Sequence, residues 1–156
     1  MRLLALFVLC FLAGAGPVRA DSGLVEIIAL IKRQASAIAT ADATTFKADW
    51  IDGGSIVDGF PPYLWIGPGF QDGWMRDFAK GVATAGLTNF RVSVKKAQQI
   101  SIAGDTAYAV VPTSVTWDDK GKHGREHGTW TIVLKHSGAG WKILAWAWGG
   151  PPPKFR

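Results

Sequence analysis

Residues 104–149 read GDTAYAVVPTSVTWDDKGKHGREHGTWTIVLKHSGAGWKILAWAWGG, and this stretch decides the fold. Three segments in it are rich in Val, Thr, Ile, Tyr and Trp, as strands are: residues 106–117, 129–135 and 141–148. The segments between them, residues 118–128 and 137–140, carry the Gly, Asp, Lys and His that punctuate strands. The stretch therefore predicts an antiparallel meander of three strands.

The chain upstream of the meander reads mainly as helix. Residues 22–38 place apolar side chains three and four apart behind a capping Ser22, which predicts an amphipathic helix. Further helices are expected at 43–50 and 70–84, a turn at Asp52-Gly53-Gly54, a short strand at 55–60 and a strand over 90–102. Helices ahead of a run of antiparallel strands indicate a single α+β domain with the helices packed on one sheet face.

The first twenty residues have the features of a secretory signal peptide. Arg2 supplies a short positive start, residues 3–13 form an apolar run, and Val18 and Ala20 occupy the positions that a signal peptidase reads. The run is shorter than the roughly 20 residues of a membrane-spanning helix. We expect cleavage after Ala20 and export to the periplasm or the medium, with a domain at residues 21–149 and an extended, proline-containing tail at 150–156.

The chain from Asp21 onward contains no cysteine, because Cys10 is the only one in the sequence. An exported domain without disulfide bonds depends on its hydrophobic core, and a chain of this length can bury one. Loss of Arg2 and Arg19 leaves 15 basic against 12 acidic residues and lowers the net charge from +5 to +3. The basic residues form no dense stripe, so we expect no nucleic-acid partner, and no membrane span after cleavage.

Several short segments, taken in order, resemble the nuclear transport factor 2-like superfamily, specifically its SnoaL-like and ketosteroid-isomerase-like branch. They are Ala41-Asp42-Ala43 with Phe46 and Trp50, SIVDGF at 55–60, the aromatic helix at 73–80, GDTA at 104–107 and GWKI at 140–143. The resemblance implies a cystatin-like cone, in which a curved antiparallel sheet wraps around the N-terminal helices and leaves a pocket at the open end. It also implies a homodimer through the outer sheet face. Such folds include both enzymes and non-catalytic proteins.

Asp58 is the first candidate for chemistry. Val57-Asp58-Gly59-Phe60-Pro61 matches the place where ketosteroid-isomerase-like proteins carry a general base. A carboxylate at the mouth of an apolar pocket would be partly desolvated, which raises its pKa toward values useful for proton transfer. The alternative is a strand-end aspartate that accepts hydrogen bonds from the loop that follows.

His127 is the second candidate, as an acid or base at the entry to the strand 129–135. His123 lies four residues earlier, but Gly121, Gly124 and Gly128 argue against a helix that would bring the two together, so we expect a solvated loop and no metal site.

The pattern also departs from a steroid isomerase. The first helix offers Gln34 or Ser36 where a tyrosine is required, and the segment 129–135 has no carboxylate. This departure argues against steroid isomerisation itself.

Aromatic side chains are expected to line the pocket, since eight tryptophans exceed what a small core readily absorbs. The substrate-binding residues that we predict are Phe60, Tyr63, Trp65, Trp130, Trp146 and Trp148. Simple alternation along the last strand places Trp146 and Trp148 on one face, and Trp141 and Ile143 on the other.

Two functions remain open. The first is an exported small-molecule-binding protein that catalyses proton transfer without a cofactor, as an isomerase, cyclase or dehydratase does, with Asp58 as general base and His127 in support. The second is a non-catalytic module for ligand binding or dimerisation.

Overall fold

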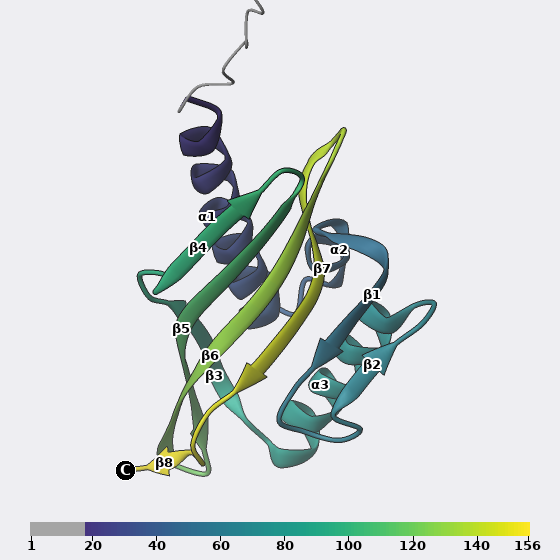
Figure 1. Cartoon of the computed structure of the whole chain (residues 1–156). Coiled ribbons are helices and arrows are strands. Elements are labelled where there is room, and N and C mark those ends of the chain that lie inside the picture. The colour runs from purple at the N-terminus through teal and green to yellow at the C-terminus, as the bar shows by residue number, and fades with distance from the viewer. Residues whose placement is uncertain (1–17) are drawn as a thin grey trace, which may run out of the picture.

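The computed structural model describes residues 18–156, which form three helices and eight strands (Figure 1). The helices are α1 (Val18–Ala39), α2 (Ala43–Ala48) and α3 (Phe70–Ala85). The strands are β1 (Trp50–Val57), β2 (Leu64–Ile66), β3 (Thr88–Val94), β4 (Gln99–Ala103), β5 (Thr106–Asp119), β6 (Lys122–Ser137), β7 (Gly140–Gly149) and β8 (Lys154–Phe155). Residues 1–17 of the expected signal peptide lie outside the described residues. Within residues 18–156, no helix is long and apolar enough to cross a membrane.

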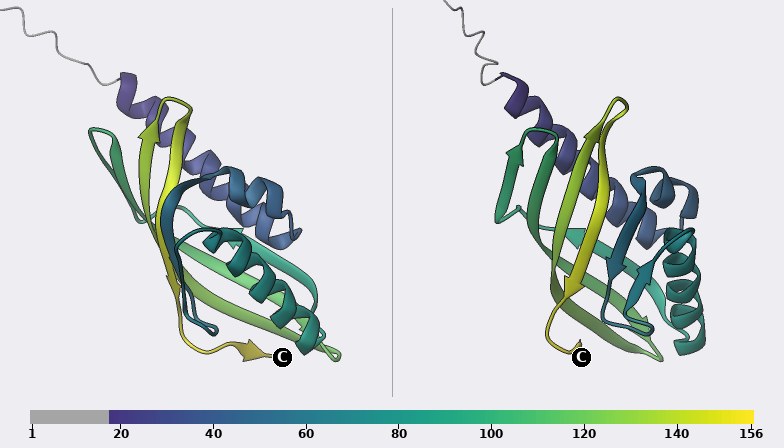
Figure 2. Two further views of the ribbon diagram at one scale, coloured as in Figure 1. Left: turned by 90° about the vertical axis from the view of Figure 1, so that its right-hand side faces the viewer. Right: turned by 45° about the vertical axis from the view of Figure 1, so that its right-hand side comes forward.

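The strands form one bent sheet, and the helices lie on its concave side (Figure 2). The strand order is β2-β1-β7-β6-β5-β3, with β4 also pairing β5 and β8 also pairing β6. Every pair is antiparallel except β1 with β7, which is parallel. The expected α+β cone is confirmed, with one parallel pair added to the antiparallel sheet.

Helix α1 forms the centre of the core. The predicted apolar stripe is correct for Ile27, Leu30 and Ile31, which are fully buried against the sheet, whereas Ile28 is exposed. Leu134 of β6 and Ile143 of β7 face this stripe and are also fully buried. Burial of each such side chain contributes about 1.5–3 kcal/mol, so these residues contribute substantially to the attachment of α1 to the sheet.

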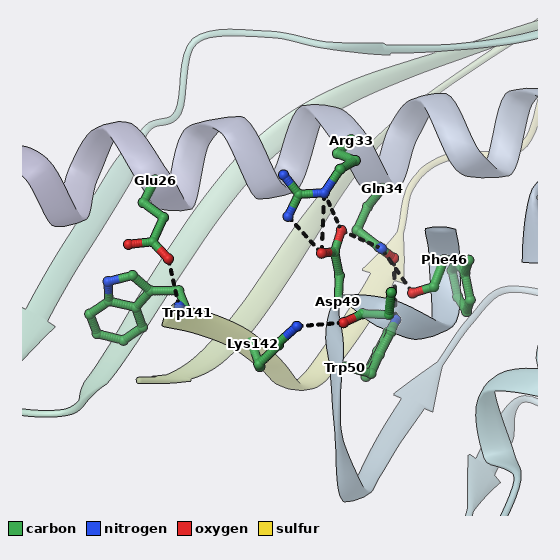
Figure 3. Close-up of polar contacts among 9 residues, drawn as sticks. Glu26, Arg33, Gln34, Phe46, Asp49, Trp50, Trp141 and Lys142 are labelled. Carbon is green, nitrogen blue, oxygen red and sulfur yellow. Dashed lines mark hydrogen bonds and ion pairs between the residues drawn. The ribbon is translucent and has the colours of Figure 1, made fainter. Parts of the chain in front are cut away.

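A polar network joins α1 to the junction of α2 and β1 (Figure 3). The buried Asp49 carboxylate accepts hydrogen bonds from the Arg33 guanidinium, at 2.6 Å from Nη2, and from the Gln34 amide at 3.1 Å. Gln34 also donates to the Phe46 carbonyl and accepts from the Trp50 indole N–H. Both donors and the acceptor of the Gln34 amide are therefore occupied by the protein. Gln34 does not replace the tyrosine donor that the first helix lacks.

Helices α1 and α2 are each tied to β7 by a hydrogen bond. The Glu26 carboxylate of α1 accepts the backbone N–H of Trp141 at 2.8 Å, and Lys142 donates to the Ala48 carbonyl of α2 at 2.6 Å. Both contacts are drawn in Figure 3. They connect the first two helices to the last long strand.

The hairpin between β5 and β6 corrects the sequence prediction. Residues 118–128 were expected as a solvated loop, but β5 continues to Asp119 and β6 begins at Lys122. Only Lys120 and Gly121 form the turn, with φ of 49° and 84°, the signs that a type I′ hairpin turn requires. Gly124 and Gly128, which also suggested a loop, instead lie within β6.

Two irregularities along β1 and β7 also differ from simple alternation. The expected turn at Asp52–Gly54 lies inside β1, where the pairing with β7 shifts register. On β7, Ile143 pairs Leu134 and Ala145 pairs Val133, so Leu144 is an extra, bulged residue. A bulge changes which face the following side chains occupy, and Trp146 therefore lies on the buried face together with Ile143.

The C-terminal tail is extended, as expected, and it is paired. Strand β8 pairs with Gly124 and Arg125 of β6, and His123 and Arg156 exchange two backbone hydrogen bonds of 3.0 Å. Phe155 contacts Trp117 edge to face, with ring centroids 6.1 Å apart. The tail thus returns across the hairpin end of the sheet.

Candidate functional site

A cavity of about 320 Å³ lies between α3, the halves of β5 and β6 next to their hairpin turn, and the tail. This volume is at the small end of ligand sites, which span about 300–1,000 Å³. Its walls are mainly aromatic: Phe60, Trp74, Phe78, Phe90, Trp117, Trp130 and Trp148. Within the described chain, only Asp58 and Glu126 among the lining residues carry a charge.

Asp58 follows the end of β1 and reaches the cavity beside Trp74 of α3. One carboxylate oxygen accepts the Gly59 backbone N–H at 2.7 Å, and the other accepts the Trp74 indole N–H at 3.0 Å. Burial raises the pKa of Asp58 to about 6, although both hydrogen bonds favour the ionised form. The carboxyl therefore changes its protonation state near neutral pH.

Glu126 lies on β6, on the cavity wall. Burial raises the pKa of its carboxyl, and the nearby Asp58 charge raises it further. The described residues provide no hydrogen-bond or ion-pair partner for this carboxyl. The cavity thus holds two acidic groups that influence each other's protonation.

The aromatic walls are held by close packing between rings. Trp74 stacks on Phe78 with centroids 5.0 Å apart, and Phe78 meets Phe90 edge to face at 5.1 Å. Trp148 donates its indole N–H to the Thr113 hydroxyl at 2.9 Å, which holds the ring against the sheet. These contacts give the cavity a preformed shape.

Two glycines of β6 make room for the tryptophans on the wall. A Cβ atom at Gly124 would lie 2.4 Å from the Trp117 ring, and one at Gly128 would lie 2.4 Å from the Trp148 ring. Any larger residue would force these rings to move. The hairpin glycines are therefore required by the wall of the cavity rather than by a turn.

The indole N–H groups of Trp117 and Trp130 have no hydrogen-bond partner among residues 18–156, and both rings line the cavity. The nitrogen edge of Trp117 packs against Gly124 of β6, where a Cβ atom would lie 2.5 Å from Nε1. An indole N–H is a donor only, so Trp130 is the lining tryptophan that remains to donate to an acceptor on a bound molecule.

The structure brings together half of the predicted substrate-binding residues. Phe60, Trp130 and Trp148 line the cavity. Trp65 is buried behind Phe60 and donates to Asp77, and Tyr63 is 58% exposed on the loop before β2.

Trp146 belongs to the core instead of the cavity wall. It is stacked between neighbouring rings, at 5.1 Å from Trp130, and its buried indole N–H has no partner among the described residues. Phe46, Trp50 and Trp74 also contact the Trp146 ring, whereas Trp148, two residues further along the same face of β7, lines the cavity.

The structure does not place His127 beside Asp58. Along β6 successive side chains alternate between the two faces, so Glu126 and Gly128 face the cavity and the exposed His127 does not line it. The expected support for Asp58 from His127 is therefore wrong in its geometry. Glu126 was missed because residues 118–128 were read as a loop; two-residue alternation leading into Trp130 could have identified it.

His123 does not form a metal cluster in the described part of the chain. It pairs with Asp118 at 2.9 Å across the hairpin end, and residues 18–156 hold no group of three or more His, Cys, Asp or Glu side chains that could bind a metal ion.

Comparisons with known proteins agree on the fold. Residues 27–147 match the family model described as SnoaL-like domain. A comparison with curated protein sequences gave no significant match.

Three solved structures illustrate the structural similarity. An NTF2-like protein with a cystatin-like fold from Novosphingobium aromaticivorans has 19% identity and a TM-score of 0.71, over 85% of this chain and 84% of that one. An NTF2-like superfamily protein from Salmonella enterica has 19% identity and a TM-score of 0.71, over 85% and 94%. The hexachlorocyclohexane dehydrochlorinase LinA-type3 from Novosphingobium barchaimii has 10% identity and a TM-score of 0.76, over 90% and 94%. At these identities the similarity shows the fold alone.

Proposed function

The chain belongs to the SnoaL-like domain family, and we propose that it binds a small, largely apolar molecule in its cavity and transfers a proton at that molecule through Asp58. The observation that carries this proposal is the position of the Asp58 carboxyl, which lies on the wall of an aromatic cavity with a pKa of about 6. A general base works best when its pKa lies near the working pH. The fold itself does not select the reaction.

In this proposal Asp58 removes a proton from a carbon or heteroatom of the bound molecule. The hydrogen bonds from Gly59 and Trp74 hold the carboxylate in one orientation, which keeps the acceptor oxygen in place as the proton moves. Glu126 is the second acid–base group of the proposed site, and its pKa is raised, mainly by burial. Two titratable carboxyls in one cavity can accept and return a proton, as an isomerase or a lyase requires.

The indole N–H group of Trp130 completes the proposed site. As negative charge develops on an acceptor atom of the substrate, this donor stabilises it in a largely apolar surrounding. It takes the place of the tyrosine donor that the first helix lacks. The dehydrochlorinase acts on hexachlorocyclohexane, a small ring compound, which is consistent with an apolar ring compound as substrate here.

A non-catalytic ligand-binding module is the second candidate. The observation in its favour is that both Asp58 oxygens already accept hydrogen bonds from the protein, as a structural aspartate does. Both candidates predict a ligand in the cavity. They differ in whether Asp58 exchanges a proton with it.

Hydrogen exchange distinguishes the two without knowledge of the net reaction. Small ring compounds are first screened by thermal shift, and those that bind are incubated with the protein in D₂O and followed by proton NMR. The wild-type protein should catalyse deuterium incorporation into a bound compound, and Asp58→Asn should slow it by about 10²–10⁴-fold, the usual contribution of a general base. Asp52→Asn, an exposed carboxyl on β1, is the matched control.

Two results of the exchange experiment would decide against parts of the proposal. Equal exchange in wild type and Asp58→Asn would remove Asp58 as the base. Tight binding with no exchange in the wild type would favour the non-catalytic module.

We also propose that the site operates outside the cytoplasm. The support is the signal-peptide pattern of residues 1–20 and the lack of cysteine from Asp21 onward. N-terminal sequencing of the protein from a periplasmic or culture fraction should begin at Asp21; an intact Met1 in a cytoplasmic fraction would contradict export.

The homodimer remains a prediction that concerns the outer sheet face. Val57, Leu64 and Ile66 of β1 and β2 are 44%, 50% and 68% exposed, so this edge presents apolar side chains to solvent. Light scattering coupled to gel filtration should give twice the chain mass, and a monomer at micromolar concentration would contradict it.

A further inference from the structure

The two acidic side chains in the cavity have no basic partner, in contrast to five acidic side chains elsewhere on the molecule. Asp49, Asp72, Asp77, Asp105 and Asp118 each pair with a basic side chain, at distances between 2.5 and 3.2 Å. Asp58 and Glu126 have no such partner, and no Lys, Arg or His lines the cavity within the described chain. The fold thus concentrates negative charge in a desolvated space and supplies no positive charge of its own there.

The walls around these carboxyls suit a cation. An ammonium group is attracted to the face of Trp, Tyr or Phe within about 6 Å of the ring centre, most strongly to Trp. Trp117, Trp130 and Trp148 line the cavity, whereas both faces of the Trp74 ring are covered by Phe46 and Phe78. A cavity that combines carboxylates with indole faces favours an organic cation over a neutral molecule of the same shape.

From this arrangement we propose that the ligand of the cavity is a small apolar amine, bound as its ammonium form. The ammonium group lies against Asp58 and Glu126, and its hydrocarbon part contacts the aromatic wall. The inference rests on the proposed site and names its substrate class.

Alternative ligand charges fit less well. An anionic ligand would face two carboxyls with no compensating cation, and repulsion at short range in a water-poor cavity is strong. A neutral ligand would leave both carboxyls buried without a counter-charge, which is unfavourable. Burial raises the pKa of both carboxyls, and the Asp58 charge raises that of Glu126 further; an adjacent cation would lower both pKa values.

A set of three probes of similar shape tests the charge preference. Phenethylamine, phenethyl alcohol and 3-phenylpropionate carry an ammonium, a neutral hydroxyl and a carboxylate on comparable hydrocarbon parts. Isothermal titration calorimetry of the protein at pH 7.5 should give at least tenfold tighter binding for the amine than for the alcohol. The carboxylate should bind more weakly than either.

Variants of the two carboxyls show where the preference originates. Asp58→Asn and Glu126→Gln should each reduce the ratio of amine to alcohol affinity, and the double variant should bring it close to one. The affinity for the alcohol should be kept, which shows that the cavity is still folded. Asp72→Asn removes an exposed carboxyl on α3 and should leave the ratio unchanged.

The pH dependence supplies a second measurement. The amine remains protonated while the cavity carboxyls ionise as the pH rises. The affinity of the protein for the amine should therefore increase from pH 5 to pH 7.5. Asp58 and Glu126 are the titratable groups that line the cavity among residues 18–156. The affinity for the alcohol should not increase over this range.

The inference is overturned if the amine does not bind, if the alcohol or the carboxylate binds as tightly, or if the double variant keeps the wild-type ratio. These outcomes are measured as binding, so they are separate from the deuterium-exchange test of Asp58. Amine-selective binding without any exchange would support this inference and contradict proton transfer. Exchange in a neutral compound without amine selectivity would do the reverse.

Discussion

Asp58 makes the stability of the protein depend on pH in an unusual direction. Most carboxyls in folded proteins have lowered pKa values and stabilise the fold as the pH rises. Burial instead raises the pKa of Asp58 from 3.8 to about 6. Between these values the folded protein holds more protons than the unfolded chain, so the free energy of unfolding falls as the pH rises.

The magnitude follows from the size of the shift. Each pKa unit corresponds to about 1.36 kcal/mol, so the shift of about two units amounts to ~3 kcal/mol. This destabilisation is absent below pH 4 and complete above about pH 6–7. The pKa of Glu126 is raised as well, which adds to the effect in the same direction.

Asp58→Asn should therefore change the stability with opposite signs at the two ends of the pH range. The variant cannot ionise, and it also replaces one oxygen acceptor with a donor facing Gly59 or Trp74, which costs about 1 kcal/mol. At pH 4 the variant should be less stable than wild type by about 1 kcal/mol. At pH 7 it should be more stable by about 2 kcal/mol, the difference between the two effects.

Urea unfolding followed by tryptophan fluorescence measures this at pH 4, 5, 6 and 7. The difference between variant and wild type should change sign within this range, and Asp52→Asn should show no such change. A difference that stays constant from pH 4 to pH 7 would refute the assignment of a buried, raised-pKa carboxyl to Asp58.

Three further changes test other parts of the structure. Gly128→Ala should destabilise the fold by about 1–3 kcal/mol, because the added methyl group overlaps the Trp148 ring. Urea unfolding measures this, and an unchanged midpoint would show that the ring moves freely. Asp49→Asn should lower the free energy of unfolding by about 2–3 kcal/mol, since Arg33 and the buried Gln34 amide lose a charged acceptor. A loss below about 0.5 kcal/mol would contradict the role of this polar network. Phe155→Ala should weaken ligand binding severalfold in calorimetry and have little effect on thermal unfolding. The reason is that the exposed Phe155 ring contacts Trp117 on the cavity wall and lies outside the core. Equal affinity would exclude the tail from the site.

The fold could be predicted from the sequence because its signals are local. The apolar spacing of residues 22–38 predicts α1, and the composition of each segment of the meander predicts one strand. The order of those elements then selects helices on one face of an antiparallel sheet. The parallel pairing of β1 with β7 could not be predicted, since it joins segments about 90 residues apart and leaves no pattern in either.

The candidate site was only partly predictable, for a physical reason that differs between residues. Asp58 could be identified from its place before a Gly and Pro loop. Glu126 could not be identified, because Gly124 and Gly128 are typical of a loop. In the structure they lie in a strand and make space for tryptophans on the neighbouring strands. Trp146 was assigned to the cavity together with Trp148 because both lie on one face of β7, and only tertiary packing against Phe46 and Trp50 places Trp146 in the core.

The pairing of Gly124 with Trp117 and of Gly128 with Trp148 has an evolutionary consequence. The dimensions of the binding space depend on these glycines and on the rings that they accommodate. The proposed acid–base chemistry is carried by other positions. A lineage can therefore acquire a new ligand size through one exchange on β6 while Asp58 and Glu126 stay the same, so that closely related chains can bind molecules of different size with the same pair of carboxyls.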